Sequence, residues 1–484
     1  MNDKKITLNA GQKDAMKKLE AFLKDAYSQV FILKGYAGTG KTTMIKTLVD
    51  FMHEHEINFG LLASTGRAAK ILGDITGTQA KTIHSEIYSF GGFNCDTDKI
   101  AEEKVLPPGT QLSIMFSLKQ SSDSADVYII DEASMISDVE DKSAVQSSFG
   151  TGKLLSDLMQ FSSGSRFIFV GDPCQLPPVS GETSPALAVP YFKKHFDINA
   201  CETTLTEVMR QSDDSGLLEA ATQIRQLWES APEDENCYPV NKWGRMPLRG
   251  HRDLVLLDTI ESLASRYLKD IRNGNYSEAA FICKSNSGCY KFSLQFREAL
   301  GFRGRLQTGE LLLVMQNNLI SGLRNGDLVV VESISSASEE RAGLTFRKIK
   351  VRELNSGQSF EQFMIDDILY QSQTNLDSLQ QSQLFADFII RMSKIGISRK
   401  HPAFVDMMRS DAYLNALRLS FGYALTCHKA QGGEWKNVYA CFPRNIMLNP
   451  TKSKYQWVYT AMTRAQQKFF VVDDIYVDGF RKRF

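Results

Sequence analysis

The sequence predicts an α/β protein with two lobes, each a parallel β-sheet flanked by helices. A small β-barrel is expected in the second lobe and a short insertion in the first. Short apolar runs alternate with amphipathic stretches over residues 29–171 and again beyond residue 201, which is typical of parallel sheets covered by helices. Between residues 310 and 366 the pattern changes to closely spaced β runs separated by turn signals such as NGD, which favours a barrel. The length of 484 residues also exceeds what one hydrophobic core supports.

The same patterns give expected domain boundaries. We expect the first lobe over residues 1–200, with residues 87–126 as its insertion because GGFN, LPPG and SSDSAD interrupt the α/β rhythm there. The second lobe is expected to cover residues 201–309 and 415–484. The barrel and a linker are expected to occupy residues 310–414, between the two parts of that lobe.

Composition narrows the class of protein. With 43% hydrophobic and 23% charged residues, the chain is typical of folded globular proteins. Lys+Arg and Asp+Glu both total 56, so a nucleic-acid partner would need a locally basic groove. No apolar run is long enough to span a bilayer and the polar start lacks a signal peptide, so we expect a cytoplasmic protein without membrane contact. Eight scattered cysteines without a CxxC pair predict free thiols and no zinc site.

A phosphate-binding loop is the strongest local signal. The segment GYAGTGKT follows an apolar strand and precedes a helical pattern, which is the context that a P-loop requires, although a glycine-rich turn could arise by chance. Lys41 is expected to reach the β- and γ-phosphates of ATP and Thr42 to bind Mg²⁺. The residues expected to hold the nucleotide are Gly35, Ala37, Gly38, Thr39, Gly40, Lys41, Thr42 and Thr43.

Two further strands end in polar residues that fit ATP hydrolysis. The run VYIIDEAS places Asp131 and Glu132 after an apolar strand. Asp131 is expected at the Mg²⁺ position and Glu132 is expected to polarise the attacking water. The run RFIFVGDPCQLPP supplies Gln175, which could hydrogen-bond the γ-phosphate or the water, or could be an ordinary loop amide.

At this point the chain resembles superfamily 1, group B helicases of the RecD/Dda type, which are related to the Pif-type enzymes. The resemblance covers nearly the whole chain. It rests on nine short motifs in the family's order: LNAGQ, GYAGTGKTT, ASTGRAAK, KTIHS, DEASM, GDPCQLPPV, LTEVMRQ, LTCHKAQGGEW and YTAMTRA. It implies two RecA-like P-loop lobes, an SH3-like inserted barrel and a strand-separating pin in the first-lobe insertion.

The resemblance also assigns roles to individual residues. Gln12 would read adenine, and Arg210 and Arg464 would reach the γ-phosphate as arginine fingers. On spacing alone, each arginine would rather be a surface ion-pair partner. The positions expected along a single-strand track are Thr65, Arg67, Thr82, His84, Thr426 and His428; for the two histidines a structural role is the alternative.

The pin residue itself is left open. Phe90 and Phe93 are candidates, and local core packing is an equal alternative for both. The resemblance predicts no separate N-terminal domain, because the first motif begins at Leu8. It predicts no nuclease activity, because no acidic cluster lies outside the motor motifs.

The expected function is an ATP-dependent DNA helicase that uses ATP and Mg²⁺ to move 5′–3′ on single-stranded DNA and to open tailed duplexes. The direction follows from the group B marks GDPCQLPPV and TCHKAQGGEW together with the inserted barrel. The chain is expected to act as a monomer in DNA repair, recombination or replication, with single-strand-binding or recombination proteins as further partners. The alternatives are a DNA-dependent ATPase that remodels complexes without processive unwinding, a subunit of a larger recombination complex, and a P-loop small-molecule kinase.

Overall fold

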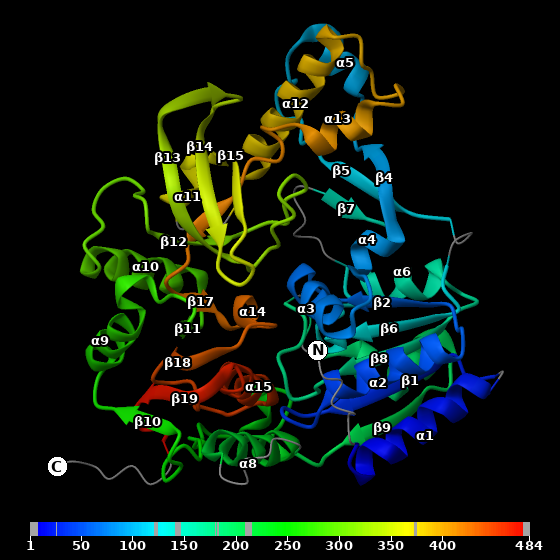
Figure 1. The fold of residues 1–484 in the computed structure, drawn as a ribbon, viewed down its shortest axis with the longest axis vertical. Helices are drawn as coiled ribbons and strands as arrows, with labels where there is room; N and C mark the ends of the chain where they lie inside the picture. The colour runs from blue at the N-terminus through cyan, green and yellow to red at the C-terminus, as the bar shows by residue number, and fades with distance from the viewer. Residues whose placement is uncertain are drawn as a thin grey trace.

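The computed structural model consists of two α/β lobes that lie side by side, with further segments above them (Figure 1). It describes residues 8–477 apart from 26, 121–123, 141–146, 180, 182, 209–214 and 372–374. No helix within these described ranges is both long enough and apolar enough to cross a membrane.

The first lobe contains a six-stranded parallel sheet of order β3-β2-β6-β8-β1-β9. Its strands are β1 (Val30–Gly35), β2 (Phe59–Ala63), β3 (Ala80–Thr82), β6 (Val127–Asp131), β8 (Arg166–Gly171) and β9 (Cys201–Leu205). The central strands are buried along nearly their whole length, as expected where helices cover both faces of a parallel sheet. The helices are α1 (Ala10–Lys24), α2 (Lys41–Glu54), α3 (Gly66–Thr76), α4 (Ile83–Ile87), α6 (Leu154–Phe161) and α7 (Val189–Phe196), with one-turn 3-10 helices at Ala133–Met135 and Pro185–Leu187.

The boundary expected between the lobes is wrong by one strand. We expected the second lobe to begin at residue 201, but β9 pairs with β1 along its full length and forms the edge of the first sheet. The mostly exposed residues of β9 give no apolar signal for either lobe. The first element of the second lobe is instead α8 (Gly216–Ser230).

The first-lobe insertion is a three-stranded sheet with one helix. It consists of β4 (Tyr88–Phe93), α5 (Thr97–Glu103) and β5 (Ile114–Leu118), in the expected 87–126 range. A third strand, β7 (Ser147–Phe149), comes from beyond that range and pairs with β5.

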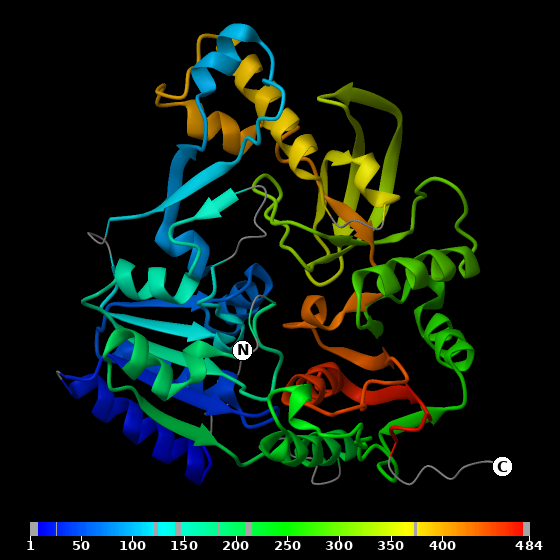
Figure 2. The ribbon, with the colours of Figure 1, turned by 180° about the vertical axis from the view of Figure 1, so that it is seen from behind.

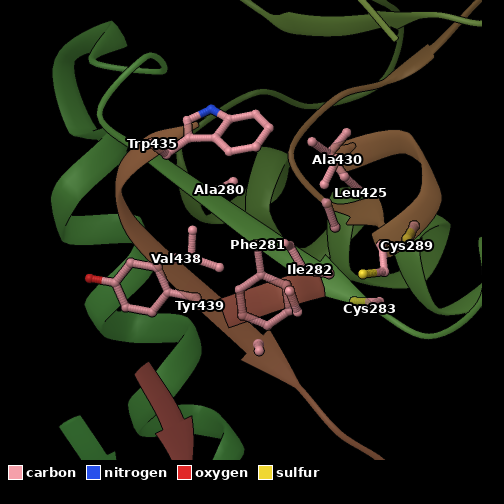
Figure 3. Close-up of a cluster of buried hydrophobic side chains, with 14 of the residues drawn as sticks. Ala280, Phe281, Ile282, Cys283, Cys289, Leu425, Ala430, Trp435, Val438 and Tyr439 are labelled. Atoms are coloured by element: carbon pink, nitrogen blue, oxygen red, sulfur yellow. The ribbon is translucent and has the colours of Figure 1, made fainter. Parts of the chain in front are cut away.

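The second lobe is built on a five-stranded parallel sheet of order β10-β19-β18-β11-β17. Its strands are β10 (Leu254–Leu257), β11 (Ala279–Cys283), β17 (Leu425–Thr426), β18 (Trp435–Cys441) and β19 (Ala465–Val472). Beside α8 it has helices α9 (Ile260–Ile271), α10 (Asn286–Ala299), α14 (Cys427–Ala430) and α15 (Lys452–Met462), and 3-10 turns at Glu235–Cys237 and Arg272–Gly274. Side chains of β11 and β18, among them Phe281 and Tyr439, fill its core (Figure 3).

An antiparallel sheet of order β15-β14-β13-β12-β16 is inserted into the second lobe, and we call it the β-insertion. Its strands are β12 (Leu311–Val314), β13 (Leu328–Arg341), β14 (Leu344–Glu353), β15 (Ser359–Ile365) and β16 (Leu419–Phe421). The backbone of Leu417 hydrogen-bonds Phe363 and Ile365 at 2.7 and 3.1 Å, so the two edges of the sheet are joined there. We expected residues from 415 onward in the second lobe, but β16 pairs with β12 and belongs to this sheet.

Three helices follow β15: α11 (Asp366–Leu369), α12 (Ser378–Lys394) and α13 (Phe404–Ser410). Both views place α12 and α13 beside α5 of the first-lobe insertion (Figures 1 and 2). Phe93 lies there with its ring centroid 5.8 Å from that of Phe385 and 6.3 Å from that of Phe404, and Phe90 packs against the same apolar cluster. The packing alternative therefore describes both pin candidates in this structure.

Candidate nucleotide site and strand track

The P-loop connects β1 to α2 at the carboxyl edge of the first sheet. Gly38 and Gly40 have φ angles of 77° and 81°, a left-handed conformation that glycine adopts without strain. The turn ends where α2 begins at Lys41, which directs the first N–H groups of that helix toward the loop. This is the geometry that binds phosphate in P-loop proteins. Thr42 is exposed and Thr43 half-buried in the first turn of α2.

The Lys41 side chain folds back over this loop. Its Nζ donates hydrogen bonds to the carbonyl oxygens of Gly35 and Tyr36 at 2.8 and 3.2 Å. The same amine lies 3.8 Å from the Oδ2 of Asp172. The lysine charge is thus already placed between the loop and an acidic group of the neighbouring strand end.

Gln12 lies beneath the P-loop, completely buried. Its side chain completes a capping box with Asn9 at the start of α1, and its Nε2 donates to the carbonyl oxygen of Thr39 at 3.2 Å. The position beside the loop is compatible with contact to the base of a nucleotide, and the adenine role remains a prediction.

The acidic pair lies at the end of β6, at the same sheet edge: Asp131 is the last residue of the strand and Glu132 follows it. Glu132 has a φ of 51°, which costs an ordinary residue strain and is often found at functional sites. Its backbone N–H donates to the Oδ1 of Asp131 at 2.8 Å. Burial and the adjacent Glu132 carboxylate raise the pKa of Asp131 to about 7, while the Lys41 charge opposes this rise. Among the residues that the structure describes, Glu132 Oε2 is buried without a hydrogen-bond partner.

These acidic groups fit a magnesium ion held together with phosphate. A buried carboxylate with a raised pKa and an unpaired carboxylate oxygen are both stabilised by a nearby cation. The described residues hold no group of three or more His, Cys, Asp or Glu that could bind a metal by itself. Mg²⁺ matches such a site, because it uses one or two protein oxygens and completes its shell with phosphate and water.

The loop after β8 lies against both the P-loop and the second lobe. Gln175 is 4% exposed, and within the described chain its Oε1 has no hydrogen-bond partner. Asp172 is fully buried; burial raises its pKa, and Lys41 and a hydrogen bond from Tyr459 oppose the rise. Sequence reasoning did not include Asp172 in the site. The available signal was its place directly after β8, close to that of Asp131 at the end of the neighbouring strand β6.

The second lobe contributes the opposite wall through α15. Tyr459 donates to Asp172 Oδ2 at 2.8 Å and accepts from the N–H of Ala37 at 2.7 Å. Sequence reasoning did not assign this residue. Arg464 follows the helix and is 7% exposed. Its guanidinium donates to the carbonyl oxygens of Thr460 and Gly433 at 3.2 and 3.4 Å. Arg464 is therefore held by its own lobe beside the wall, and Arg210 falls outside the described residues.

The three threonines expected along a strand track share one geometry. Each lies at or just after the end of a strand and caps the helix that follows: Thr65 caps α3, Thr82 caps α4 and Thr426 caps α14. Their Oγ1 atoms accept from the N–H three residues later, at 3.2, 3.2 and 3.4 Å respectively. The sequence therefore placed all three at carboxyl ends of strands in their own lobes, where ligands gather in open α/β sheets.

The basic residues expected on this track are buried or half-buried. His84 packs edge-on to Phe149 with ring centroids 5.1 Å apart, and burial lowers the pKa of both His84 and His428. Arg67 is 8% exposed; it lies 5.5 Å from the Trp435 ring centroid and donates to the Gly326 carbonyl oxygen at 3.4 Å. Arg67 thus reaches across to the β-insertion and the second lobe.

A polar groove lies between the first lobe and the β-insertion. One wall includes Lys70, Lys81 and Thr82, and the other includes Arg324 and Phe360. Cationic and hydroxyl groups with a partly buried aromatic ring suit a nucleic-acid backbone and its bases. Asp74 and Asp327 also line this groove. Lys70 and Lys81 pair with Glu353 and Glu86 at 3.2 and 2.8 Å, so the groove has mixed charge.

All eight cysteines, every one of them within the described ranges, are free thiols. Four of them are buried, namely Cys174, Cys283, Cys289 and Cys427. Cys174 lies in the loop after β8, where its backbone N–H donates to the Asp172 Oδ1 at 2.9 Å.

Two family models match the chain. The AAA domain model matches residues 7–231, and the UvrD-like helicase C-terminal domain model matches residues 421–472. The first match covers the P-loop, the acidic pair and the loop after β8. The second covers the capped helix α14 and the whole of α15.

Among the proteins similar in sequence are two DNA helicases. The ATP-dependent RecD2 DNA helicase of Deinococcus radiodurans is 26% identical over 455 residues, which is 91% of this chain and 46% of that protein. The ATP-dependent DNA helicase Dda of Enterobacteria phage T4 is 31% identical over 225 residues, which is 45% of this chain and 42% of that protein. The matched regions therefore span about half the length of these relatives.

A solved structure, the Pif1 helicase from Bacteroides in complex with ADP-AlF3 and single-stranded DNA, aligns with 97% of this chain and 92% of its own at 17% identity and a TM-score of 0.47. The chain thus matches an AAA domain model and a UvrD-like helicase C-terminal domain model, and it is similar in sequence to the RecD2 and Dda helicases.

Proposed function

We propose that the chain is an ATP-dependent DNA helicase that moves 5′–3′ along single-stranded DNA and separates duplex strands. The observation that carries this proposal is the contact between the P-loop of one lobe and α15 of the other, with Arg464 immediately after that helix. A nucleotide site shared by two lobes can convert hydrolysis into relative movement of the lobes, because losing the γ-phosphate weakens their contact.

Residues of both lobes would take part in ATP hydrolysis. Lys41 places its charge on the β- and γ-phosphates, and Glu132 orients and polarises the attacking water. Thr42 and Asp131 would hold Mg²⁺, which offsets phosphate charge. Gln175, Arg464 and Arg210 would stabilise the transferred phosphoryl group.

Buried polar atoms without protein partners support a ligand at this site. Within the described residues these atoms include Glu132 Oε2, Gln175 Oε1 and both amide atoms of Gln431. Leaving such atoms unpaired costs about 1–3 kcal/mol each. The nucleotide, its water and the cation would supply partners for Glu132 and Gln175, while Gln431 lies in the second lobe after α14.

The DNA strand would run over the capped helix starts of both lobes and along the groove beside the β-insertion. Hydroxyls and backbone N–H groups bind phosphates without regard to base sequence. Because burial lowers the pKa of His84 and His428, these two histidines would act as neutral donors rather than as cations. We assign the β-insertion as an SH3-like barrel and the first-lobe insertion as the strand-separating element, and we propose that the monomer is active.

An ATPase titration with single-stranded DNA and with RNA tests the motor assignment. We expect strong stimulation of ATP hydrolysis by DNA, and its absence would contradict a DNA-driven motor and favour a small-molecule kinase. A tailed-duplex assay then separates a helicase from a DNA-dependent ATPase that only remodels complexes, since only the helicase releases the strand.

A further inference from the structure

A single face of α15 holds the loop after β8. Gln456, Tyr459 and Thr460 are spaced i, i+3 and i+4, so they lie on one side of the helix. The Gln456 Nε2 donates to the Pro173 carbonyl oxygen at 3.0 Å. The backbone N–H of Leu176 donates to the Thr460 Oγ1 at 2.9 Å. Together with the bond from Tyr459 to Asp172, these contacts fix the loop that carries Gln175 to the second lobe.

The Tyr459 hydroxyl makes a second contact that the other two residues do not make. It accepts the hydrogen bond of the Ala37 N–H at 2.7 Å while donating to Asp172. Tyr459 is 1% exposed, so solvent cannot replace either partner. Because Asp172 Oδ2 also lies 3.8 Å from Lys41 Nζ, one hydroxyl is linked to both the P-loop backbone and the partner of the P-loop lysine.

Nucleotide phosphate requires the same groups. P-loop N–H groups and the P-loop lysine are the donors that surround phosphate oxygens. A phosphate that engages the Ala37 N–H must displace the Tyr459 hydroxyl from it. A phosphate that draws Lys41 away from Asp172 leaves the Tyr459 hydroxyl as a main remaining donor to that carboxylate.

We propose that Tyr459 is a positioning residue that competes with phosphate for the P-loop. When nucleotide binds, the Ala37 N–H exchanges the Tyr459 hydroxyl for a phosphate oxygen. Tyr459 keeps its hydrogen bond to Asp172, so the loop after β8 stays attached to the second lobe. The inference rests on the proposed function, and it assigns to this site a competition between the second lobe and the nucleotide. Phosphate arrival thereby changes how the lobes contact each other before any arginine finger acts.

Tyr459→Phe tests the exchange, because it removes the hydroxyl and keeps the ring. Without its competitor, the Ala37 N–H is free for phosphate, so we expect ADP and a non-hydrolysable ATP analogue to bind about 2–10-fold more tightly, the range of one ordinary hydrogen bond. We also expect the DNA-stimulated kcat to fall, because Asp172 loses its contact with α15. A purely structural tyrosine would weaken binding and turnover together.

Two further variants separate the parts of the inference. Thr460→Val removes only the bond to Leu176, so it should lower the DNA-stimulated kcat and leave ADP affinity unchanged, and Thr460→Ser should restore turnover. Tyr455→Phe is the matched control. Tyr455 is a buried tyrosine on the same helix, and it lines a groove of the second lobe. This variant should match wild type in both measurements.

Equilibrium ADP binding without DNA and ATPase kinetics with saturating DNA are the two readouts, with thermal melting to verify folding. Unchanged or weaker ADP binding by a folded Tyr459→Phe variant would overturn the competition, and an unchanged DNA-stimulated kcat would overturn the coupling. A wild-type protein without DNA stimulation would instead contradict the proposed function, while the comparison of ADP affinities would still decide the exchange.

Discussion

Glu132→Gln is the sharpest test of the hydrolytic assignment. Glutamine and glutamate have the same shape at and beyond Cβ, so the substitution leaves the backbone strain at this position (φ 51°) unchanged while it removes the negative charge. An amide cannot accept a proton from the attacking water. Removing a general base lowers the rate about 10²–10⁴-fold, which corresponds to an increase of roughly 3–5 kcal/mol in the activation free energy of hydrolysis.

Nucleotide binding should survive this substitution. The P-loop N–H groups and Lys41 remain in place, and the Glu132 carboxylate is one cause of the raised pKa of Asp131. Removing that carboxylate lowers the pKa of Asp131, so Asp131 is more fully ionised at neutral pH and binds Mg²⁺ at least as well.

Steady-state ATPase assays with saturating single-stranded DNA, and equilibrium binding of ADP, measure the two effects separately. Glu54→Gln, at the far and exposed end of α2, is the matched control and should match wild type. A Glu132→Gln variant that keeps kcat within tenfold of wild type, or that loses ADP affinity in proportion to kcat, would refute the water-activating role.

Four other outcomes are expected. Lys41→Ala should lower kcat by orders of magnitude in the same ATPase assay, because its charge acts on phosphates that gain charge during transfer; near-normal turnover would remove Lys41 from the site. Arg464→Ala and Arg210→Ala should each lower DNA-stimulated turnover, by about 10³-fold if they act as arginine fingers, with unchanged single-strand affinity in a nucleotide-free titration; a loss confined to DNA affinity would move that arginine to the strand track. Single-strand affinity should fall with salt by about 0.7 log unit per log unit of salt for each phosphate contacted, and a salt-independent affinity would contradict a phosphate-binding groove. Duplexes with a 5′ tail should be unwound and those with only a 3′ tail left nearly intact, and the reverse preference would overturn the group B direction.

The local parts of the site could be predicted from the sequence. The P-loop, Asp131, Glu132 and Gln175 each follow an apolar strand within a few residues, so pattern and spacing determine where they lie. The capping threonines were predictable for the same reason. A strand buried on both faces is recognised from its own residues, and the loop after it is then placed at the sheet edge.

Features that depend on contacts distant in sequence were missed or misplaced. The edge strand β9 and the short strand β16 were assigned to the wrong sheet, because pairing with β1 and β12 decides their membership. The burial of Arg67 depends on Trp435, which is far away along the chain. Tyr459 was not assigned because its role depends on hydrogen bonds with Ala37 and Asp172, which lie in the other lobe.

The apolar cluster of Phe93, Phe385 and Phe404 has a mechanical consequence. It joins the first-lobe insertion to α12 and α13 at a place remote from the nucleotide site (Figure 1). Between these two places, Arg67 and Lys70 of the first lobe also contact Gly326 and Glu353 beside the β-insertion. Interlocked aromatic rings resist sliding because close-packed side chains have little free space. Any change in how the lobes contact each other at the nucleotide site is therefore constrained by this far contact as well.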